Sequence, residues 1–242
     1  MRVSNRGPPI VRATARVALA QQREEVLSSE PQSVQQRPPR SYYETNPFST
    51  RWRSNIARMV GTIMPPDWDN MELLDLGVGD GYTIRLIKPK GKITGLDPDR
   101  EAVAAARERG IAAQEGSAYV LPFPSESFGL VTCIEVLEHL SRPEYALGET
   151  HRILQPGGYL LITTPIPNAM WRTLWWTWTR LGPGKRWRSM PHVTNLRIGC
   201  GSSEEGDLVA MLGRLNFEVV RTRVCNGGMV AGLLALKKHG MA

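Results

Sequence analysis

The chain has 242 residues, a formal net charge of +7 and three cysteines, and these numbers restrict the class of protein. Its length suits one domain with extensions. The cysteines show no C-x-x-C spacing, so the sequence predicts neither a zinc knuckle nor a disulfide framework and is typical of a reducing compartment. No apolar run reaches the roughly 18 residues that span a bilayer, and none near the start resembles a secretory signal. We therefore expect a cytoplasmic protein, either soluble or peripheral to a membrane.

Residues 1–40 differ in composition from the rest of the chain. They contain seven arginines, three glutamates and five prolines, with few large apolar residues. This composition predicts a basic, largely disordered N-terminal arm before a domain over residues 41–242. The first 23 residues carry five arginines and no acid, so an organellar transit peptide is the alternative interpretation.

Apolar residues at helical spacing predict a lead-in helix over residues 42–64. From residue 71 onward strands and helices alternate, as in a parallel sheet covered by helices. The predicted strands are 71–76, 92–97, 111–115, 128–134 and 158–164, and the predicted helices are 81–88, 99–109, 142–154 and 205–215. Two closing strands, 217–225 and 229–237, flank Asn226-Gly227-Gly228, a turn that suits an antiparallel hairpin. The fold class we expect is α/β with a mostly parallel sheet.

The first strand ends in a glycine-rich turn, Asp75-Leu76-Gly77-Val78-Gly79-Asp80-Gly81. Such a turn lets a ligand approach the main chain, and the following helix offers unpaired N–H groups. The G-x-G-x-G spacing departs from the G-x-G-x-x-G pattern of dinucleotide sites, because Tyr82 stands where the last Gly would be. Asp75 would repel a pyrophosphate but suits an α-ammonium group. Asp97 ends the next strand, near the offset at which an acid accepts hydrogen bonds from ribose hydroxyls. The turn therefore favours S-adenosylmethionine over NAD.

With these motifs the chain, from about residue 73 to 238, resembles the class I S-adenosylmethionine-dependent methyltransferases. Four further motifs carry the resemblance: Gly116-Ser117-Ala118 with Leu121-Pro122-Phe123, Phe128-Gly129-Leu130-Val131, Glu135-Val136-Leu137-Glu138-His139, and Leu154-Gln155-Pro156-Gly157-Gly158. The resemblance implies a Rossmann-like, mostly parallel seven-stranded sheet with an antiparallel terminal hairpin and helices on both faces. It also implies S-adenosylmethionine as cofactor and S-adenosylhomocysteine as product.

The resemblance assigns cofactor contacts residue by residue. Asp75 and the glycines would hold the methionine part of the cofactor, and Asp97 the ribose. The family often has an Asp after the third strand for the adenine amine, whereas this chain has Ser117, so adenine recognition would use Ser117 and the Ala118 backbone. The complete set of expected cofactor-binding residues is Asp75, Gly77, Gly79, Gly81, Asp97, Pro98, Ser117, Ala118 and Glu135.

A tryptophan- and arginine-rich segment, Trp171–Arg188, lies within an insertion that we expect at about residues 166–195. It holds five of the seven tryptophans and a net charge of +5, while residues 1–40 carry +4, so the remainder of the chain is slightly acidic. Trp with Arg or Lys on one helix favours a bilayer interface, and membrane-surface docking is our first hypothesis. The alternatives are a substrate lid packed on the core and, less favoured, nucleic-acid binding through stacking and phosphate contacts.

The Glu135-x-x-Glu138-His139 run and the later His192 permit two interpretations. A similar run with a distant His binds a divalent metal in small-RNA 2′-O-methyltransferases, which makes Glu135, Glu138, His139 and His192 candidate metal ligands. The same residues also occur in methyltransferases that resemble the quinone-biosynthesis O-methyltransferases, where no polymer is implied. We expect His192 to act as the catalytic base on a hydroxyl, with no bound metal. The alternatives are core or loop roles for these side chains.

The sequence thus predicts a methyltransferase whose acceptor is a small, apolar or lipid-like molecule, O-methylation being the first expectation. The site would mainly align nucleophile, carbon and sulfur, because the sulfonium is already electrophilic. The alternative is an RNA or protein methyltransferase in which the basic arm and Trp171–Arg188 grip a polymer. The slightly acidic remainder of the chain favours the small molecule, and the sequence does not indicate an oligomeric state.

Overall fold

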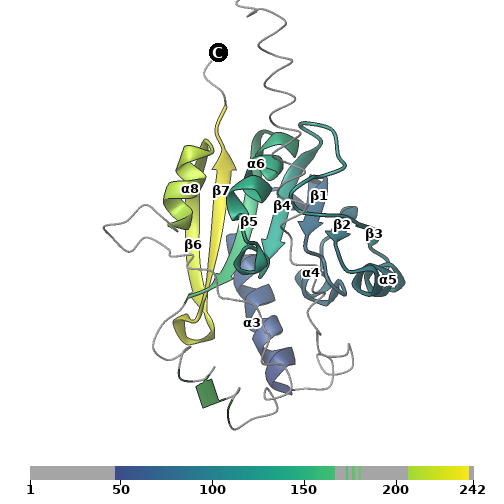
Figure 1. The fold of residues 1–242 in the computed structure, drawn as a ribbon, viewed down its shortest axis with the longest axis vertical. Coiled ribbons are helices and arrows are strands. Elements are labelled where there is room, and N and C mark those ends of the chain that lie inside the picture. Colours follow the sequence, from purple (N-terminus) through teal and green to yellow (C-terminus); the bar gives the residue numbers. More distant parts are fainter. Residues whose placement is uncertain (1–46, 167–172, 174–175, 178–179, 181–206, 240–242) are drawn as a thin grey trace, which may run out of the picture. The chain divides into compact units, whose positions relative to one another are not determined.

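The computed structural model describes residues 47–166, 173, 176, 177, 180 and 207–239. Their seven strands form one sheet in the order β3-β2-β1-β4-β5-β7-β6 (Figure 1). The strands are β1 Leu73–Leu76, β2 Ile93–Asp97, β3 Ala112–Glu115, β4 Phe128–Ile134, β5 Leu154–Pro165, β6 Phe217–Cys225 and β7 Val230–Lys237. Strands β1 to β5 pair in parallel, whereas β7 is antiparallel to both β5 and β6. The predicted fold class and the terminal hairpin are therefore confirmed.

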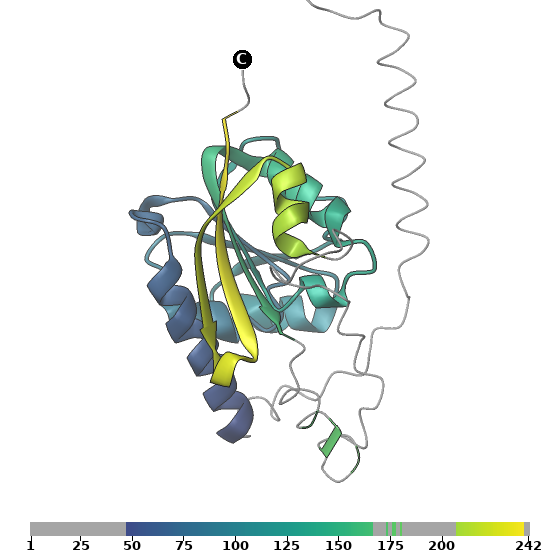
Figure 2. The ribbon, with the colours of Figure 1, turned by 90° about the vertical axis from the view of Figure 1, so that its left-hand side faces the viewer.

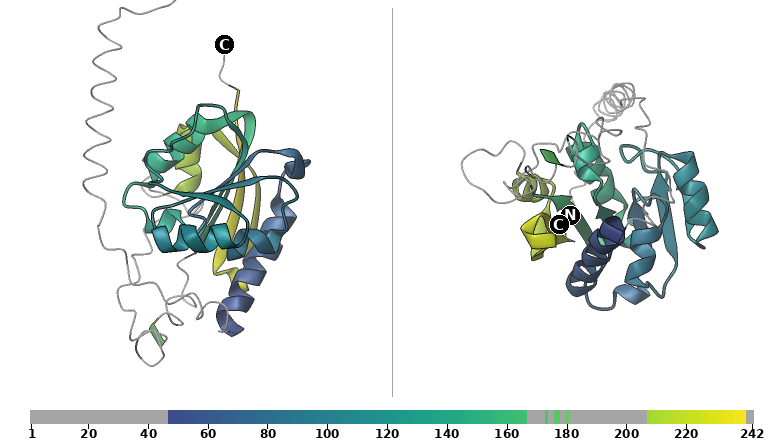
Figure 3. Two further views of the ribbon diagram at one scale, coloured as in Figure 1. Left: turned by 90° about the vertical axis from the view of Figure 1, so that its right-hand side faces the viewer. Right: turned by 90° about the horizontal axis from the view of Figure 1, so that it is seen from below.

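Helices cover both faces of this sheet (Figures 2 and 3). The α-helices of the described part are α3 Pro47–Ile63, α4 Tyr82–Ile87, α5 Arg100–Glu108, α6 Pro143–Ile153 and α8 Leu208–Arg214. Three short 3₁₀ helices are η1 Trp68–Asn70, η2 Leu137–His139 and η4 Asn226–Gly228. Asp99 and Asp207 are the N-caps of α5 and α8. Each side chain accepts hydrogen bonds from two backbone N–H groups that have no partner within the helix.

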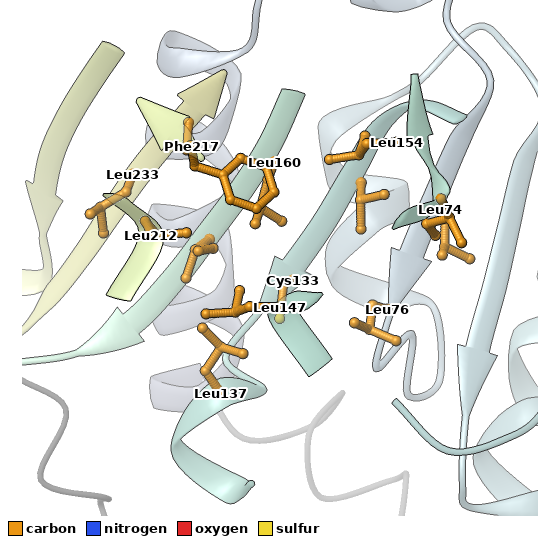
Figure 4. Packing of buried hydrophobic residues seen from close by; sticks show 14 of the residues in the cluster. Leu74, Leu76, Cys133, Leu137, Leu147, Leu154, Leu160, Leu212, Phe217 and Leu233 are labelled. Atoms are coloured by element: carbon orange, nitrogen blue, oxygen red, sulfur yellow. The ribbon is translucent and has the colours of Figure 1, made fainter. Parts of the chain in front are cut away.

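Two apolar clusters, one on each side of the sheet, hold the layers together. On one face α3, α4 and α5 contribute Ile56, Val60, Ile84 and Val103. On the other face the residues come from η2, α6, α8 and the strands, as Figure 4 shows: Leu137, Leu147, Leu154, Leu160, Leu212, Phe217 and Leu233. Because the parallel strands are buried on both faces, their sequences read as continuous apolar runs.

The start of β5 is the main departure from the sequence prediction. We expected a strand over 158–164 after a Pro-Gly-Gly turn, but β5 begins at Leu154, directly after α6. The Leu154 carbonyl accepts from Nζ of the buried Lys237, 83 residues away, and Leu154 pairs with Phe128 of β4. Gly157 has φ +75°, so the expected turn is present as an irregularity within the strand. A contact from the last strand, which local pattern does not reveal, fixes this boundary.

Several sequence predictions lie outside the described residues. These are the arm over 1–40, the start of the lead-in helix, and most of the insertion at 166–195. The predicted domain boundary near residue 40 therefore stays a prediction.

Candidate functional site

The glycine turn after β1 lies at the carboxyl edge of the parallel strands, where ligands bind in open α/β sheets. Gly77, Gly79 and Gly81 all have positive φ, of 73°, 53° and 73°. A Cβ on Gly77 would lie 2.3 Å from Val136, and one on Gly81 2.4 Å from Ile111, so packing explains both positions. A Cβ on Gly79 would meet nothing within 4 Å. Gly79 therefore leaves open space on the surface of the turn.

Asp97, at the end of β2, links this turn to the next one. Its carboxylate accepts one hydrogen bond from the Gly79 N–H at 2.9 Å and another from the Asp99 N–H at 3.0 Å. The residue is only 2% exposed. These two hydrogen bonds hold the carboxylate of Asp97 in place, and carboxylate oxygens are acceptors of the kind to which hydroxyl groups donate.

Asp75 is buried in the middle of the sheet, between β2 and β4. The Thr132 hydroxyl donates to its Oδ1 at 2.6 Å. Burial raises the pKa of Asp75 to about 7; the Thr132 hydrogen bond opposes this rise, and the nearby charge of Asp97 adds to it. The sequence predicted a negatively charged Asp75. With a pKa of about 7, the carboxyl group is present in both its charged and its neutral form near pH 7.

The N-terminal half of α3 contacts the glycine turn. Arg53 donates to Oδ1 of Asp80 at 3.4 Å, and Arg109, just after α5, lies 3.7 Å from Oδ2 of the same carboxylate. The two guanidinium groups lie 5.5 and 5.6 Å from the centroid of the Tyr82 ring. Tyr82, which replaces the last glycine of the dinucleotide pattern, thus takes part in a cation–π arrangement that holds α3 and α5 to the turn.

Glu135 follows β4 directly and has φ +56°, an unusual conformation for a residue with a side chain. Its backbone N–H donates to the Thr163 carbonyl at 3.0 Å and lies 3.1 Å from the Thr163 hydroxyl. Trp52 Nε1 of α3 donates to Glu135 Oε2 at 3.3 Å, whereas Oε1 is shielded from solvent without a hydrogen-bond partner. Burial raises the pKa of Glu135 to about 6, against the Trp52 hydrogen bond and the Arg53 charge.

Glu138 and His139 both lie on η2, but their side chains differ in exposure to solvent. Glu138 is 5% exposed, and its pKa is well above the ordinary value because of burial and the charge of Glu135. His139 is exposed. No group of three His, Cys, Asp or Glu side chains within the described residues could hold a metal ion. His192, the fourth candidate metal ligand and the expected base, lies outside them.

The loop after β3 carries the residues that we expect to contact the adenine. Ser117 and Ala118 are half-buried, and the Ser117 hydroxyl accepts from the Tyr119 N–H at 3.2 Å. The Tyr119 hydroxyl lies 3.2 Å from the Ser141 hydroxyl and accepts from the Arg142 N–H, which ties this loop to the one after η2. Pro98, by contrast, is exposed beside Asp97.

The Leu121-Pro122-Phe123 motif is held by a clamp from α6. Arg152 donates to the carbonyls of Leu121 and Phe123 at 2.9 and 2.8 Å and pairs with Glu149. Glu149 in turn accepts from the Leu121 N–H at 3.0 Å. These contacts therefore attach the loop after β3 to α6.

The comparisons with known proteins agree with this geometry. A family profile for a methyltransferase domain matches residues 74–162. A probable S-adenosylmethionine-dependent methyltransferase of Mycolicibacterium smegmatis is 35% identical over 97 residues, which is 39% of this chain and 38% of that protein. Over residues 74–162 the chain is therefore similar to the class I S-adenosylmethionine-dependent methyltransferase superfamily. The cofactor of this superfamily is S-adenosylmethionine.

Two further relatives show how far the similarity extends. The ubiquinone biosynthesis O-methyltransferase of Pseudomonas aeruginosa is 28% identical over 130 residues, covering 50% of this chain and 52% of that enzyme. A solved structure from Thermotoga maritima, described as a possible histamine N-methyltransferase, has a TM-score of 0.61 at 22% identity, covering 82% of this chain and 93% of that one. The chain thus spans about half the length, or less, of the curated relatives it matches, and the solved structure establishes the fold alone.

The geometry fits this cofactor at two points. Gly79 leaves open space on the turn, and Asp97 beside it presents carboxylate oxygens suited to ribose hydroxyls. The sequence predicted both residues but missed Trp52, Arg53 and Thr132. The Trp52–Glu135 and Thr132–Asp75 pairs are separated by 83 and 57 positions, so no local motif indicates them.

None of the helices in the described part of the chain is long and apolar enough to cross a membrane. The proposed membrane-facing segment, Trp171–Arg188, is described at only four of its positions, residues 173, 176, 177 and 180.

Proposed function

We propose that this protein transfers the methyl group of S-adenosylmethionine to a hydroxyl of a small, apolar or lipid-like acceptor. The observation that carries the cofactor part is the open surface at Gly79 next to the buried carboxylate of Asp97. The similarity to the ubiquinone biosynthesis O-methyltransferase supports the acceptor part.

In this proposal each end of the cofactor has its own residues. Asp97 accepts hydrogen bonds from the ribose hydroxyls, while Ser117 and the Ala118 backbone contact the adenine. Gly77, Gly79, Gly81 and Pro98 shape the surface on which the cofactor lies.

The methionine end would lie between Asp75 and Glu135, whose pKa values burial raises to about 7 and about 6. A cationic ligand favours the ionised form of both carboxyl groups, so its binding would be coupled to proton release. Trp52 positions Glu135 by donating to its Oε2.

When bound, the cofactor supplies an electrophilic methyl group on a sulfonium, so the protein's main task is alignment and exclusion of water. The chain provides rigid supports for this task. Asp80 is held between Arg53 and Arg109, and Tyr119 links the loops after β3 and η2. His192 remains our proposed base for the acceptor hydroxyl.

The test is to incubate the protein with methyl-labelled S-adenosylmethionine and a total cell extract, then partition the products between organic solvent and an aqueous phase with RNA and protein. We expect label in the solvent. Label confined to RNA or protein would contradict the small acceptor and support the polymer alternative, especially if a metal chelator abolished it.

We further propose that the protein is cytoplasmic and that Trp171–Arg188 docks on a membrane surface to collect the acceptor. The protein would then be peripheral to that membrane. Its five tryptophans and net charge of +5 support this. Co-sedimentation with anionic liposomes at low salt should be lost when its tryptophans are replaced by Ser; failure of the intact protein to co-sediment would refute membrane docking.

A further inference from the structure

Two polar side chains at the carboxyl edge of β4 and β5 have no proposed role in binding the cofactor. Glu138 is 5% exposed and Thr164 is 1% exposed. Glu138 Oε2 and Thr164 Oγ1 are shielded from solvent, and neither has a hydrogen-bond partner among the described residues. An unpaired buried polar atom costs about 1–3 kcal/mol, and native proteins rarely retain one without a reason.

The two side chains belong to one place in the fold. Ile134, the last residue of β4, pairs with Thr163 of β5, and the next residue of β5 is Thr164. The chain turns at Glu135, whose N–H donates to Thr163, and η2 then brings Glu138 back to this edge. Leu137, buried beside Leu147 of α6, anchors η2 there (Figure 4). Burial and the charge of Glu135 raise the pKa of Glu138, and the neighbouring Thr164 hydroxyl opposes this rise, which shows that the two side chains lie close together.

The chemistry of this pair restricts what can bind to it. A hydroxyl group both donates and accepts, so it can pair with a carboxyl group and a second hydroxyl together. A carboxylate ligand would instead bring a negative charge next to Glu135 and Glu138 in a poorly solvated place, which is unfavourable without a cation. No ion pair of the described residues includes Glu138.

We propose that Glu138 and Thr164 bind and orient the acceptor's hydroxyl, so that the protein forms methyl ethers and not methyl esters. This inference rests on the proposed methyltransferase activity and adds the acceptor subsite to it. A lone pair of the acceptor oxygen forms the new bond to the methyl carbon. The carbon–sulfur bond breaks with its electron pair left on sulfur, giving the neutral thioether S-adenosylhomocysteine, and the hydroxyl proton passes to the proposed base and from there to water.

The type of product can be determined without knowing the acceptor. The full-length protein is incubated with methyl-labelled S-adenosylmethionine and cell extract, and the labelled products are treated with mild alkali and washed with acid. We expect the label to survive both steps in the solvent phase, which is consistent with a methyl ether and excludes a methyl ester and a methylamine. Release as volatile methanol, which identifies an ester, or extraction into acid, which identifies an amine, would overturn the proposal.

Variants test the two residues themselves. Thr164→Val removes the hydroxyl with little change in shape, Thr164→Ser retains it, and Glu138→Gln removes the ionisable group. We expect Thr164→Val and Glu138→Gln to lower label transfer at least tenfold while the affinity for S-adenosylhomocysteine, measured by calorimetry, changes less than twofold. Thr164→Ser should retain transfer. The matched control is Thr150→Val, which removes a buried hydroxyl that bonds only within α6, from Thr150 Oγ1 to the Ala146 carbonyl.

The outcomes separate this inference from the proposed function. Full transfer in Thr164→Val and Glu138→Gln, or equal losses of transfer and of S-adenosylhomocysteine affinity, would refute the acceptor subsite alone. A fall in thermal stability with unchanged transfer per folded protein would show a purely structural role and also refute it. Absence of any labelled product with the wild-type protein would refute the proposed function, and the subsite with it.

Discussion

Replacement of Asp97 by Asn is the sharpest test of the cofactor site, because this carboxylate has both a structural and a proposed binding role. Its oxygens accept from the Gly79 and Asp99 N–H groups at 2.9 and 3.0 Å. Asn keeps the shape but offers one acceptor oxygen in place of two. One backbone N–H therefore loses its partner, which should lower the free energy of unfolding by about 1–3 kcal/mol.

The effect on ligand binding should be larger. Hydrogen bonds to a charged group contribute about 1.5–3 kcal/mol each, and two ribose hydroxyls would share this carboxylate. A net loss of about 3 kcal/mol corresponds to roughly 100-fold weaker binding of S-adenosylhomocysteine. Isothermal titration calorimetry measures the affinity, and thermal unfolding reports whether Asp97→Asn is folded at the titration temperature.

Asp99→Ala is the matched control. Asp99 stands two residues further on and caps α5 by accepting from the Glu101 and Ala102 N–H groups. Loss of this cap should cost about 1 kcal/mol of stability and leave the ligand affinity unchanged. A folded Asp97→Asn variant that binds within threefold of wild type, or an Asp99→Ala variant that loses as much affinity, would refute the ribose assignment.

Three further predictions concern the turn, the buried acid and the clamp. Gly79→Ala and Gly110→Ala both place a Cβ in open space at positive φ, so each should cost about 1 kcal/mol of stability. Only Gly79→Ala should weaken the binding of S-adenosylhomocysteine, measured by calorimetry. Equal affinities of the two variants would show that the ligand does not lie on the turn. The pKa of Asp75 is raised from 3.8 to about 7, so between these pH values the folded protein binds one proton more than the unfolded chain. The free energy of unfolding should therefore be highest below pH 4 and should fall as the pH rises to 7, by at most about 4 kcal/mol. Urea unfolding of Asp75→Asn without ligand should therefore lose part of this pH dependence, whereas an unchanged curve would contradict the buried-acid interpretation. In Arg152→Lys, the ammonium group lacks the planar arrangement of donors with which Arg152 reaches Glu149 and two carbonyls at once. Chemical unfolding should therefore show a loss of about 1–3 kcal/mol of stability, with ligand affinity retained. A variant as stable as the wild type would show that the clamp contributes little.

Much of the fold could be predicted because its signals are local. Alternating apolar strands and helical patterns placed most elements within a few residues, and the Asn226-Gly227-Gly228 turn indicated the terminal hairpin, with Gly227 and Gly228 at positive φ. The start of β5 at Leu154 could not be predicted in this way. It depends on Phe128 and Lys237, which are distant in sequence.

The sequence by itself predicted the methyltransferase-like fold, the cofactor class and the positions of most strands along the chain, because glycines and acids at fixed spacing after a strand reflect local backbone requirements. Only the tertiary structure decided the electrostatic state of the site. Burial between two neighbouring strands, and not the residue type, brings the pKa of Asp75 to about 7. Likewise, only the packing of α3 and η2 against the sheet gives Glu135 a donor in Trp52 and brings the buried Glu138 next to Thr164. Solvent exclusion and contacts between distant segments set these properties, and neither is encoded in any short stretch of sequence.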